Sequence, residues 1–124
     1  MKVHESAENY LETILILSQK NGNVRSIDIA NHLEFSKPSV SVAMKNLRSQ
    51  GHILVDRDGY ITLTESGLQI AETIYERHTL LSSWLIHLGV SEETAMEDAC
   101  RMEHVICAES FAAIKRHVAG GSAK

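Results

Sequence analysis

The spacing of hydrophobic residues changes twice along this chain, and that change is the strongest constraint on its fold. Up to about residue 50, hydrophobic residues recur every three or four positions, as in amphipathic helices. Residues 53–55 and 60–63 are instead short runs of β-type residues, separated by the turn-forming Arg57-Asp58-Gly59. Helical spacing returns from residue 64. This order predicts a mainly α fold with a small β-wing.

The first half of the chain predicts three helices. The first covers residues 6–19, and Ser26 is a suitable N-cap for a short second helix. The residues of this second helix expected to face inward are Ile27, Ala30 and Leu33. Ser36 is a suitable N-cap for the third helix, whose first turn tolerates Pro38. Only residues 34–36 separate these two helices, which predicts a helix-turn-helix. With the hairpin as its wing, a winged helix-turn-helix DNA-binding domain is expected over residues 1–66.

The exposed face of the third helix is the candidate DNA-reading surface. Ser39 and Ser41 come early in the helix and are short enough to require close approach or bridging water, and Val42 is suited to a thymine methyl. The longer basic side chains are suited to phosphates. The predicted DNA-binding residues are Lys37, Ser39, Ser41, Val42, Lys45, Arg48 and Arg57. The alternative is a solvated helix face.

The charge of the chain is unevenly distributed. The formal net charge is -4, which is unusual for a protein that binds DNA. Residues 20–57, however, hold six basic and three acidic side chains, whereas the remainder holds six basic and thirteen acidic ones. One segment is therefore suited to phosphate and the rest to cations, although chance clustering in a short window is the alternative.

The second half of the chain predicts a helical dimerisation domain over residues 67–124. A long helix is expected from residue 64 to Gly89, with a hydrophobic stripe that includes His78 and ends at Leu88. A further helix begins after the N-cap Ser91 and runs to about Ile106, and a last helix covers about 108–118. Because such helices could hardly bury their apolar faces alone, packing against a second copy is expected, hence a homodimer.

No segment suggests a membrane or an export route. The sequence lacks the roughly 20 consecutive apolar residues of a membrane span, and its amino terminus lacks a signal-peptide core. We therefore expect a cytoplasmic protein with no membrane partner. Cys100 and Cys107 would be about 10.5 Å apart on one helix, whereas a disulfide requires Cα atoms within about 7 Å. Reduced thiols are expected.

A cluster of metal-ligating residue types lies near the end of the fifth predicted helix. Cys100, Glu103 and His104 have spacings of three and four, which places them on one side of a helix. Thiolate, carboxylate and imidazole are common ligands of divalent transition metals. His78 interrupts the stripe of the preceding helix, where a satisfied core histidine is the alternative. The first helix offers further oxygen donors in Glu8, Asn9 and Glu12, or simply a solvated face.

Several strings of residues resemble one known family. These strings are AENYLETI at residues 7–14, SKPSVS at 36–41, LTESG at 63–67, RH at 77–78 and ACRMEHV at 99–105. With them the chain resembles the iron- and manganese-dependent repressors typified by the diphtheria toxin repressor and the manganese transport regulator. The resemblance implies a winged helix, a helical dimer and metal-dependent operator binding. It also implies a short form without the SH3-like carboxy-terminal domain.

The resemblance further implies which residues bind the metal. The implied ligands are Asn9, Glu12, His78, Cys100, Glu103 and His104. Asn9 departs from the aspartate or methionine usual in the family, and a neutral amide is a weaker ligand. The second site of the iron sensors is expected to be lost or altered, because Ser82 and Met96 stand where that site has glutamate and histidine.

The sequence therefore predicts a repressor of metal homeostasis genes that binds operator DNA as a dimer when loaded with Fe²⁺ or Mn²⁺. A thiolate ligand favours Fe²⁺ over Mn²⁺, and Co²⁺, Ni²⁺ or Zn²⁺ would also fit. One alternative is a winged-helix regulator that responds to redox state or a small ligand through Cys100 without a metal. A metalloenzyme is a weaker alternative, since no general base, nucleophile or substrate pocket is evident beyond the ligands. We expect no enzymatic activity.

Overall fold

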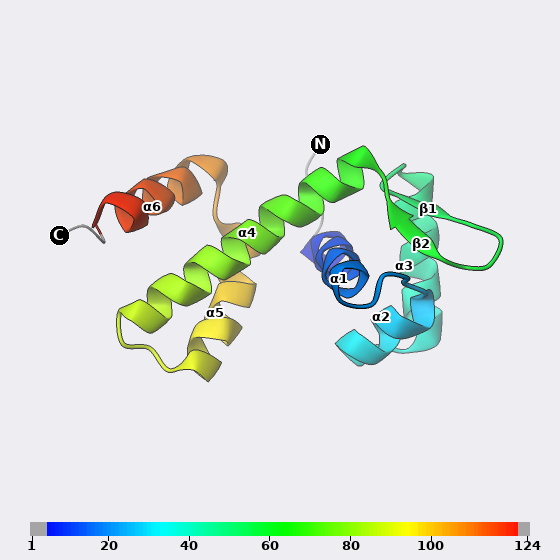
Figure 1. Ribbon diagram of the computed structural model, residues 1–124, viewed down its shortest axis with the longest axis horizontal. Coiled ribbons are helices and arrows are strands. Elements are labelled where there is room, and N and C mark those ends of the chain that lie inside the picture. Colours follow the sequence, from blue (N-terminus) through cyan, green and yellow to red (C-terminus); the bar gives the residue numbers. More distant parts are fainter. Residues whose placement is uncertain (1–4, 122–124) are drawn as a thin grey trace. The chain divides into compact units, whose positions relative to one another are not determined.

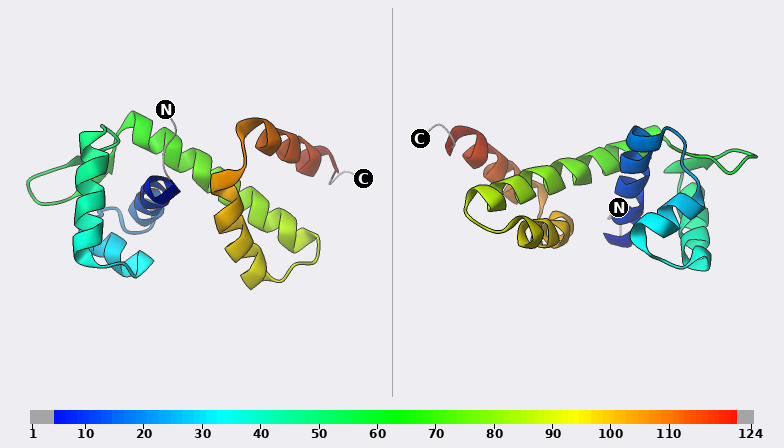
Figure 2. Two further views of the ribbon diagram at one scale, coloured as in Figure 1. Left: turned by 180° about the vertical axis from the view of Figure 1, so that it is seen from behind. Right: turned by 60° about the horizontal axis from the view of Figure 1, so that its bottom comes forward.

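The computed structural model of the chain describes residues 5–121 (Figures 1 and 2). The elements are α1 (Glu5–Asn21), α2 (Ser26–Leu33), α3 (Lys37–Ser49), β1 (Ile53–Val55), β2 (Ile61–Leu63), α4 (Glu65–His87), α5 (Glu92–Val105) and α6 (Ala108–Gly121). The predicted mainly α fold with a small wing is confirmed. The chain forms two compact units, Met1–Thr73 and Ile74–Lys124, which divide within α4. The predicted domain boundary after residue 66 falls in the same helix.

The wing is an antiparallel pair in the first unit. Ile53 pairs with Leu63 and Val55 pairs with Ile61. The turn is held by Asp56, whose Oδ1 accepts hydrogen bonds from the backbone N–H groups of Asp58 and Tyr60, both at 2.9 Å. Gly59 has φ 85°, a left-handed conformation that glycine adopts without steric cost. The hairpin predicted from the Arg-Asp-Gly turn is therefore present.

As predicted, only residues 34–36 separate α2 from α3, but the N-cap of α2 differs from the prediction. Ser36 caps α3, because its Oγ accepts a hydrogen bond from the Ser39 N–H at 3.3 Å. The N-cap of α2, however, is Arg25 rather than Ser26. The Asp28 carboxylate accepts a hydrogen bond from the Arg25 N–H at 2.9 Å. This bond is the one that a side chain at N3 makes to the N-cap backbone, so the cap lies at Arg25, one residue before Ser26.

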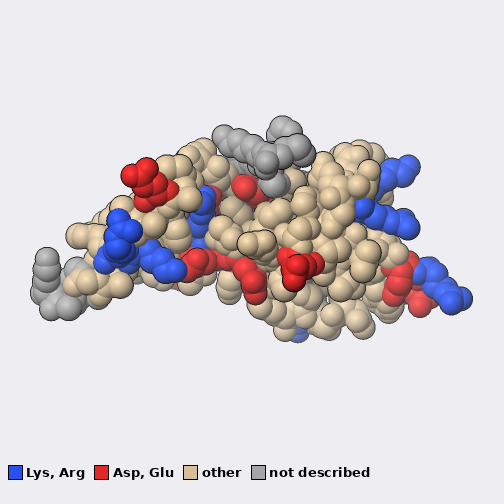
Figure 3. Space-filling model, turned by 90° about the horizontal axis from the view of Figure 1, so that it is seen from above, with Lys and Arg blue, Asp and Glu red and all other residues tan. Residues whose placement is uncertain are grey.

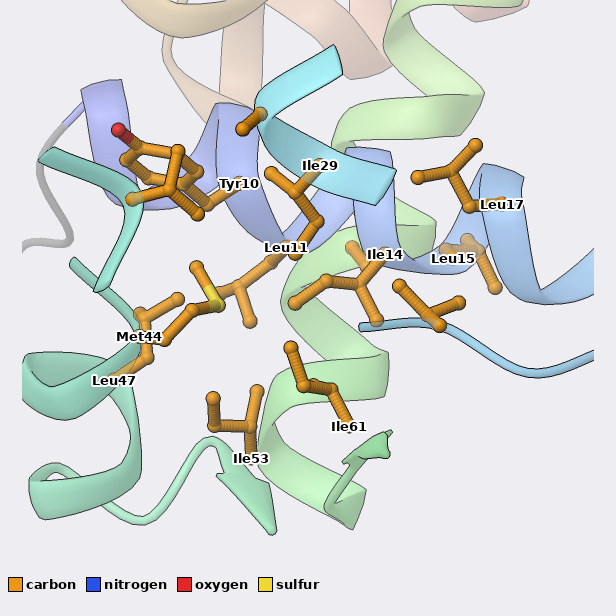
Figure 4. Packing of buried hydrophobic residues seen from close by; sticks show 14 residues of the cluster. Tyr10, Leu11, Ile14, Leu15, Leu17, Ile29, Met44, Leu47, Ile53 and Ile61 are labelled. Carbon is orange, nitrogen blue, oxygen red and sulfur yellow. The ribbon is translucent and has the colours of Figure 1, made fainter. Parts of the chain in front are cut away.

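The core of the first unit joins α1 to the helix-turn-helix and the wing. Figure 4 shows Leu11 and Ile14 of α1 among side chains of α2, α3 and the two strands. The fully or almost fully buried residues of this core include Leu11, Ile14, Val24, Ile29, Val40 and Ile53. The expected inward residues of α2 were partly wrong, since Ile27 is 38% exposed whereas Ile29 is 0% exposed. Ala30 is buried as predicted.

The second unit has a smaller core between α4, α5 and α6. Leu81 of α4, Ala99 of α5 and Phe111 of α6 are its buried residues, and Trp84 packs against them. Large apolar side chains of this unit stay exposed, namely Tyr75, Ile86, Leu88, Met96 and Val105. Leu88 does not continue the stripe, because α4 ends at His87. Helix α6 continues past the expected end near residue 118, to Gly121.

Within residues 5–121, every helix is too short or too polar to cross a membrane.

Candidate metal centre

Two residues of the second unit, distant in sequence, form the centre of the site. His78 lies in the middle of α4, and Glu103 lies in the last turn of α5. The Nδ1 atom of His78 is 2.9 Å from Oε1 of Glu103. Glu103 is 0% exposed, and the side chain of His78 is 22% exposed. His78 thus interrupts the hydrophobic stripe of α4 with a polar contact to α5, and its role as a metal ligand stays a prediction.

His104 approaches the other oxygen of the same carboxylate. Its Nε2 is 3.4 Å from Glu103 Oε2, and its side chain is 1% exposed. Oε2 has no hydrogen-bond partner among the residues that the structure describes. A buried carboxylate oxygen without such a bond raises the free energy of the folded chain. Two imidazoles and an incompletely satisfied carboxylate therefore lie together within the second unit.

The donor set fits a divalent transition metal. Imidazole nitrogens and carboxylate oxygens are ligands of Mn²⁺, Fe²⁺, Co²⁺ and Zn²⁺ alike. A cation beside Glu103 Oε2 would satisfy the oxygen that lacks a hydrogen bond, and its charge would offset that of the carboxylate. The residues present are therefore suited to the metal that the sequence predicts.

The remaining predicted ligand of the second unit is placed differently. Cys100 lies one turn before Glu103 on α5, and it is exposed rather than buried. Cys100 and Cys107 do not form a disulfide with each other, as predicted. Ser82 donates its hydroxyl to the carbonyl oxygen of His78 at 2.7 Å, so this side chain serves the helix backbone. Met96 is 44% exposed on α5. The expected loss or alteration of a second site at Ser82 and Met96 stays a prediction.

The first unit carries the other two predicted ligands. Asn9 and Glu12 lie on α1, one helical turn apart and therefore on the same side. Glu12 is 8% exposed, which is unusual for a carboxylate, and Asn9 is partly buried. The alternative of a solvated face is wrong for Glu12.

The predicted DNA-binding residues share one property. Each of them is exposed, and they lie on α3 or in the wing turn: Lys37, Ser39, Ser41, Val42, Lys45, Arg48 and Arg57. Figure 3 shows Lys and Arg side chains on the surface of the first unit, with Asp and Glu side chains beside some of them. The hydroxyl of Ser39 is 2.8 Å from that of Ser36, so part of its hydrogen-bonding capacity is used in the cap.

Sequence reasoning missed two residues beside this face. Ser26 and Ile27, at the start of α2, line a hollow together with Lys37 and Ser41. No pattern within the two residues marks them, because their position depends on the angle between α2 and α3. The structure thus extends the candidate DNA face to the amino end of α2.

Comparison with known families decides what this arrangement belongs to. Residues 2–63 match the domain described as "Iron dependent repressor, N-terminal DNA binding domain". Residues 64–120 match the domain described as "Iron dependent repressor, metal binding and dimerisation domain". The chain belongs to the iron-dependent repressor family. The cluster of His78, Glu103 and His104 lies in the part that matches the family's metal-binding domain, and the exposed α3 face lies in the part that matches its DNA-binding domain.

Named relatives of this repressor family are regulators of transcription. An uncharacterized HTH-type transcriptional regulator of Methanocaldococcus jannaschii is 32% identical over 113 residues, which cover 90% of each chain. The transcriptional regulator MntR of Escherichia coli is 34% identical over 111 residues, 90% of this chain and 72% of that protein. Membership of this family makes a metal-independent sensor built on Cys100 the less favoured alternative.

A solved structure of the repressor family shows the same architecture. A manganese-dependent transcriptional repressor in complex with manganese has a TM-score of 0.81 and 28% identity. The match covers 91% of this chain and 52% of that one, so the chain spans about half the length of this relative. Both the winged head and the helical unit therefore belong to the family fold.

Proposed function

We propose that this repressor binds operator DNA as a homodimer when loaded with Fe²⁺ or Mn²⁺, and so controls metal homeostasis genes in the cytoplasm. Residues 1–66 would read the DNA, and residues 67–124 would bind the metal and dimerise. The observation that carries this proposal is the buried Glu103 carboxylate between His78 and His104, with one oxygen lacking a hydrogen bond. A bound cation would compensate the charge of this buried carboxylate. The winged head would then turn metal binding into DNA binding.

The proposed metal ligands come from both units. His78, Cys100, Glu103 and His104 belong to the second, and Asn9 and Glu12 belong to the first. A divalent cation supplies the positive charge that these donors share. Because α1 belongs to the DNA-binding head, a donor set drawn from both units would hold the head at one angle to the dimer. Metal loading would then favour the head spacing that fits operator half-sites, about 34 Å or one helical turn apart.

The proposed DNA contacts divide by side-chain chemistry. Ser39, Ser41 and Val42 would face base edges, because they are short and lie in the first turns of α3. The basic residues would contact phosphates and fix the register of the helix: Lys37, Lys45, Arg48 and Arg57. Their exposure supports both roles, since none is needed for the core.

The choice between Fe²⁺ and Mn²⁺ depends on Cys100. A thiolate ligand favours Fe²⁺. Without Cys100, the set contains only nitrogen and oxygen donors, which suit Mn²⁺ equally. The relative from Escherichia coli is named MntR, and the solved relative holds manganese. Oxygen-free titrations of both ions, on the natural chain and on Cys100→Ser, would separate the two metals.

The test of the proposed function is metal-stimulated DNA binding. A random-sequence DNA library is enriched with the protein and Mn²⁺, and binding to the selected sequence is measured with and without metal by fluorescence anisotropy. We expect His104→Ala to lose metal stimulation while remaining a folded dimer by sedimentation. His117→Ala, which removes an exposed histidine of α6, is the matched control and should behave as the natural chain. Unchanged metal dependence in His104→Ala would refute the proposal.

A further inference from the structure

Arg77 directly precedes His78 on α4 and reaches the same residue of α5 that His78 contacts. Its Nη1 donates hydrogen bonds to the carbonyl oxygens of Glu103, at 3.1 Å, and of Ile106, at 2.7 Å. Two consecutive residues of α4 therefore hold Glu103. Arg77 holds its main chain, and His78 holds its carboxylate.

The two carbonyl groups belong to the end of α5. The helix ends at Val105, and Ile106 follows in an extended conformation with ψ 135°. The last carbonyl groups of a helix lack intrahelical partners, and the helix dipole makes this end favourable for a cation. The guanidinium of Arg77 thus acts as a C-terminal cap that is supplied by a neighbouring helix rather than by α5 itself.

Packing alone does not require an arginine here. The guanidinium lies 5.4 Å from the centre of the Phe111 ring, but its Nε is buried with no hydrogen-bond partner within residues 5–121. A methionine would fill a similar space without a buried donor left unsatisfied. The contribution that methionine could not make is the pair of hydrogen bonds to α5.

We propose that Arg77 is a positioning residue of the metal centre. It fixes the last turn of α5 against α4, so that Glu103 and His104 present their donors toward His78. Without Arg77, the end of α5 loses the hydrogen bonds that join the carbonyl groups of Glu103 and Ile106 to α4. This inference rests on the proposed function, because it assumes that these donors bind metal.

The test is Co²⁺ binding to the full chain in an oxygen-free chamber, followed by the d–d absorption of the bound ion. We expect Arg77→Met to weaken Co²⁺ binding by about tenfold, the lower end for loss of a residue that orients metal ligands. The intensity and position of the absorption bands should also change, because the donors are less well fixed. Arg77→Lys should lie between Arg77→Met and the natural chain, since an ammonium can donate to the same carbonyl groups.

Lys115→Met is the matched control, because it removes the exposed Lys115–Glu76 ion pair between α6 and α4 without touching α5. It should leave affinity and spectrum unchanged. If Arg77→Met does not fold, Arg77→Gln is measured by the same criteria. Affinity and spectrum equal to those of the natural chain would overturn the inference, as would equal losses in the methionine, lysine and control variants. Failure of the natural chain to bind Co²⁺ or Mn²⁺ would instead contradict the proposed function.

Discussion

The carbonyl oxygen of His52 lies so close to Gly67 that a Cβ on Gly67 would be 2.0 Å from it. The same oxygen accepts a hydrogen bond from the N–H of Thr64 at 3.1 Å, and the Thr64 hydroxyl donates to the Gly51 carbonyl oxygen at 2.7 Å. The first turn of α4 is therefore packed directly on the backbone that enters β1. This contact requires glycine, because no other residue fits the space.

Gly67→Ala should destabilise the winged head. The added methyl must displace backbone rather than a flexible side chain, and such overpacking costs about 1–3 kcal/mol. The measurement is the free energy of unfolding from urea titration followed by circular dichroism. Gly120→Ala is the control, since no atom lies within 4 Å of the position its Cβ would take. Alanine there should be neutral or slightly stabilising, because it favours a helix by up to about 1 kcal/mol over glycine. Equal stability of Gly67→Ala and the natural chain would contradict the packing described.

Glu103→Gln should separate metal binding from folding. The amide keeps the shape of the side chain and can still accept a hydrogen bond from His78, but it removes the charge that would bind a cation, so the metal-free chain should remain folded. At a Mn²⁺ concentration 100 times the dissociation constant, the natural chain should gain about 2.7 kcal/mol, and the variant should gain much less. Thermal unfolding with and without Mn²⁺ measures both effects. Glu76→Gln, on the exposed side of α4, is the control and should retain the full stabilisation by Mn²⁺. Full stabilisation of Glu103→Gln by Mn²⁺ would show that this carboxylate does not bind the ion.

Lys45→Gln should reduce the salt dependence of DNA binding. A lysine that neutralises one phosphate contributes about 0.9 to the slope of log K against log salt, because one counterion is released. The slope should therefore fall by about this amount for every DNA sequence tested, whereas Ser41→Ala should change the preference among sequences. Arg116→Gln, in α6 of the other unit, should leave the slope unchanged. A fall only on the selected sequence would indicate that Lys45 contacts a base.

Cys107 should react with alkylating agents at lower pH than an ordinary thiol. The Ser110 hydroxyl lies 3.4 Å from Cys107 Sγ and can donate to the thiolate, and the Ser110 backbone N–H donates to the same sulfur; both lower the pKa of Cys107. Since a lower pKa means more thiolate at a given pH, the alkylation rate should rise in a lower pH range. The pH profile with iodoacetamide, measured on Cys100→Ser, isolates this thiol. Ser110→Ala removes the hydroxyl and should move the profile to higher pH; an unmoved profile would exclude the serine as the cause.

Local patterns in the sequence were sufficient for the fold and for part of the site. The change of hydrophobic period located the wing, and Ser36 and Ser91 were correctly identified as N-caps. The spacing of Glu103 and His104 was enough to predict that both lie near the end of one helix, and α5 carries them there. The prediction was wrong at Ile27, which is 38% exposed, because the packing of neighbouring elements and not the period of α2 decides which of its apolar side chains are covered.

The sequence alone determined the order of elements, the helix-turn-helix and the residue types suited to a metal, because these depend on contacts between residues a few positions apart. Only the tertiary structure decided that His78 meets Glu103, that Arg77 caps the end of α5, and that Cys100 is exposed. Those relations join residues more than twenty positions apart, or depend on which side of a helix its neighbour covers. Helix packing sets them, and the period of a single helix carries no information about the angle of the next one.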